Sequence, residues 1–308
     1  MRIISLIASA TEIVHSLGLG EFQVGRSHEC DYPPCVAALP VCTRPKFAVE
    51  GSSREIDWRV KTALQDAAAV YDVLEDVLER LQPTHIVTQT QCEVCAVSLT
   101  DVERALSHRY GSRPIVIALE PNALGDIWKD IARVAEACGV PERGASLLDS
   151  LQARMCEIVS QAPRSGTRPR VACIEWLEPL MAAGNWVPEL VGMLGAENLF
   201  GGAGRHSPWM NWDALAASGA DAIIAMPCGF DLKRTREEMY WLTEHAGWDQ
   251  LPAVRNGRVY LADGNQYLNR PGPRIVESLR ILAEVIYPET FAPTLAGQGW
   301  ERYCGGTA

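Results

Sequence analysis

The sequence lacks both a surplus of positive charge and a long apolar run. It has 28 lysines and arginines against 38 aspartates and glutamates, which gives a formal net charge of −10. Binding to phosphate backbones or anionic lipid depends on a cationic surface, so nucleic acid is not an expected partner. No stretch of about 20 apolar residues occurs, which argues against a membrane-spanning helix. Apolar residues make up 47% of the chain, as in an ordinary globular protein.

Motifs typical of common enzymes are also missing. The chain has no phosphate-binding loop, dinucleotide glycine fingerprint, nucleophile elbow or His-Glu-x-x-His helix. His28, Cys30 and Asp31 are residue types that could act as base, nucleophile and carboxylate, but close neighbours on one loop rarely reach triad geometry. A binding protein is therefore favoured over an enzyme, with a thiol-dependent enzyme as the alternative.

The N-terminal segment does not match a secretory signal. An apolar stretch starts at Ile3, but Glu12 interrupts it before the apolar centre of about 7–15 residues is complete. Ser9 and Glu12 instead have the spacing of a capping box, which predicts that a helix begins there. We therefore expect a cytoplasmic protein, periplasmic only if it is exported by an unrecognised route.

Short β-branched runs followed by helical patterns recur along the chain and predict βα units around parallel sheets. Strands are expected at residues 2–7, 23–26, 85–88, 115–118, 170–174, 222–226 and 258–262, and helices at 11–19, 102–110, 187–194 and 274–286. Residues 54–81 are ambiguous, because helical spacing is interrupted at 69–73, which could be an edge strand.

Chain length and one long helical stretch predict the domain organisation. The 308 residues exceed the roughly 100–200 of one ordinary domain. Residues 124–160 are helical almost throughout, with a break at Gly139 and Pro141. The predicted α/β fold has two lobes with mostly parallel sheets at 1–120 and 166–290, a helical connector at 121–165 and an irregular tail at 291–308.

Polar, aromatic and thiol-bearing residues follow several predicted strands. Ligands bind beyond the carboxyl ends of parallel strands, so these loops are expected to converge on one cleft between the lobes. They hold His28, Glu29, Cys30, Asp31 and Tyr32 after 23–26, Cys92 and Cys95 after 85–88, Cys228 and Phe230 after 222–226, and Tyr267 and Arg270 after 258–262. Gly264 is expected to shape the last of these loops.

Six motifs occur in an order that resembles one protein family. They are SLIASATE at 5–12, GRSHECDYPP at 25–34, AGN at 183–185, GAENLF at 195–200, SPW at 207–209 and NRPGPR at 269–274. Together they resemble the cobalamin-binding and iron-siderophore-binding proteins of ABC importers over residues 2–288. The resemblance implies two Rossmann-like lobes joined by a long helix, with a ligand held between the lobes and little hinge motion.

The resemblance is greatest to cobalamin-binding members, which implies that the ligand is cobalamin or a related corrinoid. Aromatic rings add about 0.5–1.5 kcal/mol each beyond burial, so several of them can hold a large flat metal chelate. The candidate contacts are Tyr32, Trp176, Trp186, Trp209, Phe230 and Tyr267, with the polar residues His28, Glu29, Asp31, His206 and Arg270. The expected role is corrinoid retention, salvage or delivery in the cytoplasm.

The resemblance also implies an ABC permease as a partner, with a corrinoid-using protein as the alternative. Family members meet the permease through one acidic residue on each lobe. Glu93 could serve on the first lobe, whereas Asn265 and Asn269 stand where the second acidic residue is expected. A true importer receptor, exported by an unrecognised route, is therefore a further alternative.

The ten cysteines permit a second kind of site. Cys30, Cys92, Cys95 and Cys228 lie in candidate cleft loops and could bind zinc, cobalt or an iron–sulfur cluster. A single CxxC is a weak signal, since a structural zinc site needs four ligands, so buried thiols or a disulfide are the alternative. Cys138, Cys156 and Cys173 are expected to be small core residues. His28 and His206 could approach a corrin cobalt or donate hydrogen bonds to ligand amides.

Overall fold

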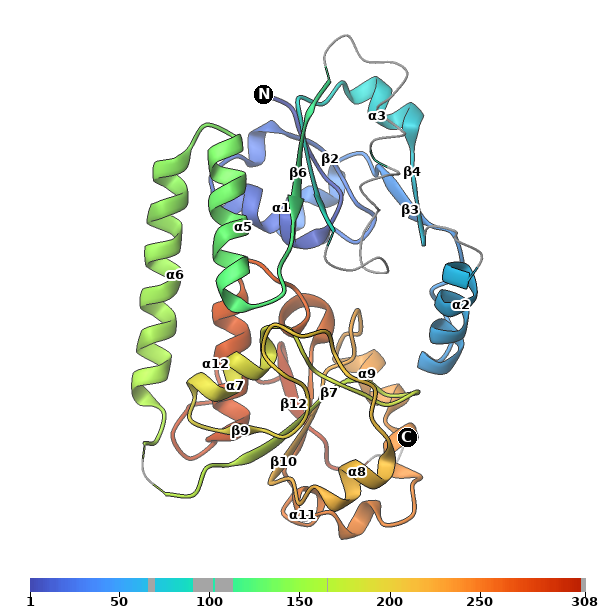
Figure 1. Cartoon of the computed structure of the whole chain (residues 1–308), viewed down its shortest axis with the longest axis vertical. Coiled ribbons are helices and arrows are strands. Elements are labelled where there is room, and N and C mark those ends of the chain that lie inside the picture. The colour runs from blue at the N-terminus through green and yellow to red at the C-terminus, as the bar shows by residue number, and fades with distance from the viewer. Residues whose placement is uncertain (66–69, 91–101, 103–112, 165, 306–308) are drawn as a thin grey trace. The chain divides into compact units, whose positions relative to one another are not determined.

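The computed structural model describes residues 1–65, 70–90, 102, 113–164 and 166–305. The chain divides into two compact α/β units (Figure 1). Unit 1 comprises Met1–Gly51, Glu55–Pro121 and Gly125–Ser150, and unit 2 comprises Ser52–Arg54, Asn122–Leu124 and Leu151–Ala308. The predicted fold class, two α/β lobes with mostly parallel sheets, is confirmed.

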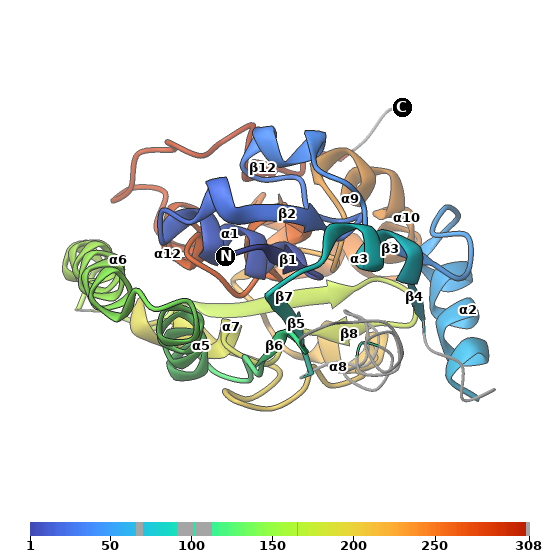
Figure 2. The ribbon, with the colours of Figure 1, turned by 90° about the horizontal axis from the view of Figure 1, so that it is seen from above.

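Unit 1 is built on a four-stranded parallel sheet with the order β2-β1-β5-β6, which Figure 2 shows from above. Its strands are β1 (Ile3–Ser5), β2 (Gln23–Arg26), β5 (His85–Gln89) and β6 (Ile115–Leu119). All four were expected from their β-branched runs. Ile4, Leu6 and Ile86 pack with Leu78 and Leu81 of a neighbouring helix in the core of this unit.

The ambiguous stretch of unit 1 contains both helix and strand. Its elements are α2 (Ser53–Gln65), β4 (Tyr71–Val73) and α3 (Glu75–Leu81), and β4 pairs antiparallel with β3 (Thr43–Pro45). The predicted edge strand is therefore confirmed. Two short 3-10 helices, Gly20–Phe22 and Pro34–Ala38, flank β2. The helix expected at 102–110 lies outside the described residues except for Val102.

The predicted capping box is wrong. Helix α1 (Ala8–Ser16) begins directly after β1, and its N-cap residue is Ile7, whose side chain makes no capping hydrogen bond. Ser9 and Glu12 therefore lie inside the helix, where both are buried. The first side chain of a capping box must belong to the N-cap residue, and here that residue is Ile7 and not Ser9.

Unit 2 has a mixed sheet with the order β12-β11-β10-β7-β8, and β9 also pairs with β7. The strands are β7 (Arg170–Trp176), β8 (Met181–Ala182), β9 (Glu197–Asn198), β10 (Ala222–Ala225), β11 (Val259–Ala262) and β12 (Trp300–Arg302). The central strands β7, β10 and β11 are parallel, as expected. Ile174, Ile223 and Leu261 from these strands pack with Trp248 in the core.

Helices and short turns of unit 2 fill the connections between these strands. They are α7 (Val187–Met193), α8 (Trp212–Ala217), α9 (Leu232–Glu238), α10 (Tyr240–Thr243), α11 (Pro252–Arg255) and α12 (Ile275–Ile286), with turns at Trp248–Gln250 and Gly264–Leu268. Helix α12 packs against α7 (Figure 1). The tail from residue 291 is not irregular throughout, because it supplies β12, which pairs antiparallel with β11.

The predicted helical connector consists of α5 (Leu124–Ala137) and α6 (Pro141–Gln161). The break falls at Gly139, whose φ of +72° suits glycine, and α6 opens on Pro141. The boundary between the units falls inside α6, between Ser150 and Leu151, so this helix belongs to both. Among the described residues, no helix is long and apolar enough to cross a membrane.

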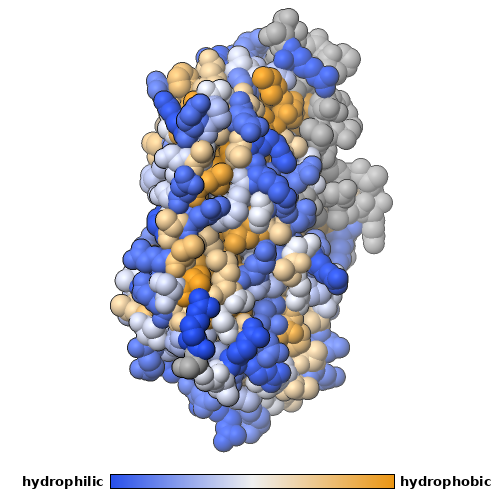
Figure 3. Space-filling view, turned by 60° about the vertical axis from the view of Figure 1, so that its left-hand side comes forward, coloured by the Kyte–Doolittle hydropathy of each residue, from blue (hydrophilic) through white to orange (hydrophobic). Residues whose placement is uncertain are grey.

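Apolar and polar side chains are mixed on the surface shown in Figure 3. On that face the coloured, described residues form small orange areas separated by hydrophilic ones. A large continuous apolar patch is a common mark of a protein interface, and this face does not carry one among those residues.

Candidate functional site

The strand-end loops of β10 and β11 in unit 2 are locked together by backbone contacts. The amide groups of Gly264 and Asn265 both donate to the carbonyl oxygen of Phe230, at 3.0 and 3.1 Å. The Asn269 side-chain amide donates to the Met226 carbonyl oxygen at 2.8 Å. A Cβ atom on Gly264 would lie 2.1 Å from the Pro227 carbonyl oxygen, so only glycine fits. The expected structural role of Gly264 is confirmed.

Three of the predicted aromatic contacts lie inside this interlocked region. Trp186, Phe230 and Tyr267 expose only 4, 6 and 3% of their surface, and Arg270 is buried too. The Trp186 indole N–H donates to the Leu268 carbonyl oxygen at 3.0 Å, and the Ser278 hydroxyl donates to the Tyr267 carbonyl oxygen at 2.9 Å. These hydrogen bonds hold the loop 263–270 in place, and direct contact of the three rings with a ligand stays a prediction.

The same loop is shaped by a buried carboxylate at its start. Asp263 accepts hydrogen bonds from the backbone N–H groups of Asn265 and Gln266, at 2.9 and 2.6 Å. Burial raises the pKa of this carboxyl, against the opposing effect of the two amides. Asp263 therefore caps the turn Gly264–Leu268 and directs the half-buried Asn265 and Gln266 away from the core.

A second loop of unit 2 presents Trp209 and His206 at the surface. Trp209 is 53% exposed, and His206 is exposed beside it. Between them, the buried Ser207 hydroxyl donates to Glu175 at 2.9 Å and accepts from the Gly184 backbone N–H at 3.0 Å. Glu175 lies at the carboxyl end of β7, so this network fixes the aromatic loop to the sheet.

Neighbouring backbone contacts rigidify this aromatic loop further. Ala182 N–H donates to the Pro208 carbonyl oxygen at 3.0 Å, and Asn185 N–H donates to the Arg205 carbonyl oxygen at 2.7 Å. A Cβ atom on Gly184 would lie 2.5 Å from the Arg205 carbonyl oxygen, so glycine is needed there as well. Sequence reasoning missed Glu175 and Ser207 as site residues, although Gly184 and Ser207 stand in two of the quoted motifs.

Replacing Ser207 by alanine is expected to lower the free energy of unfolding by about 2 kcal/mol. The change leaves the buried Glu175 carboxylate and the Gly184 N–H without their shared partner, and an unsatisfied buried polar group costs about 1–3 kcal/mol. Urea unfolding measures the difference. Ser160→Ala is the matched control, because the Ser160 hydroxyl is on the exposed side of α6. Equal stability of the two variants would contradict this role of Ser207.

Trp176 is half-buried beside the two loops. Its ring centroid is 5.2 Å from that of Phe230, and its indole N–H donates to the Glu178 carbonyl oxygen at 3.1 Å. The Arg234 guanidinium lies 4.9 Å from the centre of the Phe230 ring on the same side of unit 2. Trp176, Phe230 and Arg234 therefore form an aromatic and cationic cluster, and rings and guanidinium groups both stack on a large π-system.

The predicted residues of unit 1 lie in the loop after β2. The His28 ring nitrogen Nδ1 is 2.8 Å from the Thr43 hydroxyl, and the ring centroid is 5.1 Å from that of Tyr71. Burial lowers the pKa of His28, and the nearby Arg26 lowers it further, so the neutral imidazole is favoured. Glu29, Asp31 and Tyr32 are exposed in the same loop.

Of the four predicted thiol ligands, Cys30 and Cys228 belong to the described part of the chain. Cys30 is buried in unit 1, where the Thr11 hydroxyl donates to its sulfur at 2.9 Å, and Cys228 is half-buried in unit 2. Cys92, Glu93 and Cys95 lie outside the described residues. Within the described ranges no group of three or more His, Cys, Asp or Glu side chains could hold a metal ion. A zinc, cobalt or iron–sulfur site stays a prediction.

The other cysteines differ in their surroundings. Among the eight cysteines in the described part of the chain, no pair forms a disulfide. Cys173 is buried in β7, as expected, and burial raises its pKa to about 12. Cys138 is half-buried, whereas Cys156 is exposed on α6, so its expected core position is wrong. The buried face of α6 is formed by Leu151, Met155 and Ile158, and the Cys156 side chain is not part of it.

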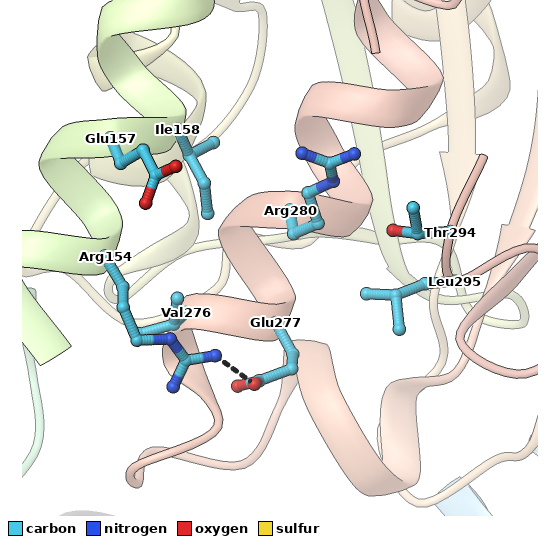
Figure 4. Close-up of a pocket in the computed structure, with 8 residues that line it drawn as sticks. All are labelled: Arg154, Glu157, Ile158, Val276, Glu277, Arg280, Thr294 and Leu295. Atoms are coloured by element: carbon cyan, nitrogen blue, oxygen red, sulfur yellow. Dashed lines mark hydrogen bonds and ion pairs between the residues drawn. The ribbon is translucent and has the colours of Figure 1, made fainter. Parts of the chain in front are cut away.

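A pocket of about 290 Å³ lies elsewhere in unit 2, between α6, α12 and the C-terminal tail (Figure 4). Arg154 on α6 pairs with Glu277 on α12 at 2.6 Å, and Thr294 and Leu295 come from the tail. None of the predicted ligand-binding residues lines it. The Arg154–Glu277 and Arg280–Glu284 ion pairs already join these elements, so we interpret this pocket as a junction between structural elements and not as the predicted site.

The chain belongs to the periplasmic binding protein family, whose model matches residues 3–265. It is similar to an uncharacterized ABC transporter substrate-binding lipoprotein, YvrC of Bacillus subtilis (strain 168), with 23% identity over 94% of this chain and 81% of the relative.

Solved structures of binding proteins share the fold. A periplasmic heme-binding protein from Pseudomonas aeruginosa has a TM-score of 0.73 at 19% identity, with 100% of this chain and 99% of that chain covered. The heme-binding protein RhuT from Roseiflexus sp. RS-1 has a TM-score of 0.69 at 22% identity, covering 94% and 98%. The vitamin B12 binding protein BtuF of Vibrio cholerae has 0.63 at 19%, covering 93% and 96%.

Proposed function

We propose that this protein is the substrate-binding protein of an ABC importer and that its ligand is cobalamin, a related corrinoid or another large metal chelate. Family membership supports the binding role, and the similar proteins RhuT and BtuF bind heme and vitamin B12 according to their names. Because fold does not determine ligand, the choice of a flat chelate rests on the site itself.

The exposed Trp209 ring carries the proposal. A surface tryptophan that is 53% exposed is usually mobile, but the neighbouring Ser207 is tied to Glu175 and Gly184. These contacts hold the loop that carries Trp209, so less of the loop has to be ordered when a ligand stacks on the exposed ring, which suits this position to bind a flat macrocycle. Trp176 and Phe230 extend the aromatic character of unit 2, and Tyr32 is an exposed ring on unit 1.

Titration with hydroxocobalamin and, separately, with hemin tests the proposal through the visible spectrum and the heat of binding. One of the two probes is expected to bind, and Trp209→Ala is expected to weaken that binding by about tenfold, since a central aromatic contact contributes about 1–2 kcal/mol. Trp58→Ala is the matched control, because Trp58 is 66% exposed on α2 and lies in neither aromatic loop. If neither probe binds at tens of micromolar, the proposal is wrong.

The proposed partner is an ABC permease, with a corrinoid-using protein as the alternative. The two partners require different locations, because a permease collects ligand from a receptor outside the cytoplasmic membrane. The cytoplasmic location expected from the N-terminal segment stays a prediction. Fractionation of native cells, followed by detection of the protein in each fraction, distinguishes a role in import from retention, salvage or delivery within the cell.

A further inference from the structure

The C-terminal tail of unit 2, residues 288–304, reaches the loop that carries Tyr267. Strand β12 runs antiparallel to β11 with Trp300 opposite Ala262, the last strand residue before that loop. Tyr303 N–H also donates to the Val259 carbonyl oxygen at 2.9 Å. The tail therefore adds a strand beside β11, at the point where the loop begins. The tail follows residue 265, where the family match ends.

The turn before β12 touches the loop directly. Asp263 N–H donates to the Gly299 carbonyl oxygen at 2.9 Å, and the Gln298 side-chain amide donates to the Tyr267 phenolic oxygen at 3.2 Å. A Cβ atom on Gly299 would lie 2.7 Å from Ile281 Cδ1 and 3.4 Å from Tyr267 Cε2. Glycine thus lets the turn approach the Tyr267 ring closely enough for both hydrogen bonds.

Glu284 on α12 anchors this turn on both sides. Its carboxylate accepts from the backbone N–H groups of Thr294 and Leu295, each at 3.1 Å, and from the Trp300 indole N–H at 2.7 Å. The turn at 295–299 lies between these points of attachment. The buried Glu284 carboxylate therefore helps to fix the position of this turn relative to α12, together with Arg280, whose guanidinium donates to the Ala292 carbonyl oxygen at 3.1 Å.

Helix α12 holds the Tyr267 residue from another direction. The Arg274 guanidinium lies 5.1 Å from the centre of the Tyr267 ring, and its Nη1 donates to the Gln266 side-chain oxygen at 3.2 Å. The Ser278 hydroxyl binds the Tyr267 carbonyl oxygen. The helix and the tail together thus determine where Tyr267 sits and how the neighbouring Gln266 is presented.

We propose that the C-terminal tail is a positioning element of the ligand-binding loop 263–270, with Gln298 as its positioning residue for Tyr267. The tail acts through Tyr267 and Asp263 and does not itself contact the ligand. This inference rests on the proposed function in one respect only, which is that the loop contributes to ligand affinity. The coupling of the tail to the loop is a property of the ligand-free protein.

The test uses Gln298→Leu in the full chain. Truncation before Thr294 would also remove the partners that the tail gives Glu284, whereas Gln298 is exposed, so its substitution is expected to lower the melting temperature by only a few degrees. Loss of one hydrogen bond is expected to weaken binding of the probe, hydroxocobalamin or hemin, by about fivefold. Hydrogen exchange of the amides at 263–266 should accelerate by a similar factor without ligand.

Three further variants make the test specific. Gln298→Glu should restore affinity and slow exchange, because its carboxylate accepts a hydrogen bond from the Tyr267 hydroxyl. In a Tyr267→Phe background, Gln298→Leu should have no further effect, since the two side chains then no longer interact. Gln250→Leu, at another exposed glutamine of unit 2, should change neither measurement.

The outcomes separate the inference from the proposed function. Unchanged exchange at 263–266 in Gln298→Leu would overturn the positioning role, whatever the protein binds. Faster exchange with unchanged affinity would also overturn it, because the loop would then move without affecting the ligand. If neither probe binds the unsubstituted protein, the proposed function fails, and the exchange measurement alone decides whether the tail positions the loop.

Discussion

Replacing Glu284 by glutamine is expected to lower the free energy of unfolding by about 3 kcal/mol, because it breaks a buried, charge-assisted network. The Glu284 side chain is fully buried and accepts from the Arg280 guanidinium at 2.8 Å as well as from the tail. A glutamine has the same shape but only one acceptor oxygen, so several buried donors lose their partner. Thermal and urea unfolding at neutral pH measure the change.

The Glu284 prediction has a defined pH dependence. Burial by itself raises the pKa of Glu284, but hydrogen bonds from Thr294, Arg280 and Trp300 outweigh it and hold the pKa below 4.5. A carboxyl with a lowered folded-state pKa stabilises the protein above its unfolded pKa and loses this contribution as pH falls through the folded value. The unsubstituted protein should therefore lose more stability than Glu284→Gln between about pH 5 and pH 3.

Glu289→Gln provides the control for both measurements. Glu289 is exposed a few residues beyond the end of α12, so its substitution removes the same charge without disturbing the buried network. Its effect on stability is expected to stay within about 0.5 kcal/mol. Similar losses of stability in Glu284→Gln and Glu289→Gln would show that the tail is not held by this carboxylate.

Replacing Gly264 by alanine is the second change with a large expected effect, also about 3 kcal/mol. The new methyl group would lie 2.1 Å from the Pro227 carbonyl oxygen and 2.6 Å from that of Met226. Both neighbours are backbone atoms at the end of β10, so they cannot turn aside as a side chain could. The two strand-end loops would have to separate, which breaks the hydrogen bonds to Phe230.

Urea unfolding of Gly264→Ala, with Gly192→Ala as control, tests this steric argument. Gly192 lies in α7 with open space around the position of a Cβ atom, so alanine there should raise stability by up to about 1 kcal/mol through helix propensity. Opposite signs for the two glycine-to-alanine changes are the expected result. Unaltered stability and probe affinity in Gly264→Ala would mean that the loops of β10 and β11 are not interlocked.

Local sequence patterns predicted much of the framework for a physical reason. The strands β5 and β6 are short runs rich in β-branched residues, and a strand buried in a parallel sheet needs little more than such a run to form. The break between α5 and α6 could also be predicted from local sequence, because Gly139 and Pro141 each determine the backbone angles at their own position.

Predictions from local patterns were wrong where a contact with a distant segment of the same unit determines the structure. Ser9 and Glu12 have the spacing of a cap, but the start of α1 is determined by the end of β1 and not by their side chains. The tail has no strand-like alternation, yet 300–302 becomes β12 because the edge of β11 offers a row of unpaired backbone groups.

The candidate site shows the same division. The sequence by itself determined two α/β units, the family and the loops on which the candidate residues stand, because these depend on periodicity and on motifs read along the chain. Only the tertiary structure decided that Trp209 is exposed on a loop tied to Glu175, whereas Trp186, Phe230 and Tyr267 are enclosed. Exposure depends on which distant segments, such as the tail around Gln298, pack against a side chain, and no local spacing contains that information.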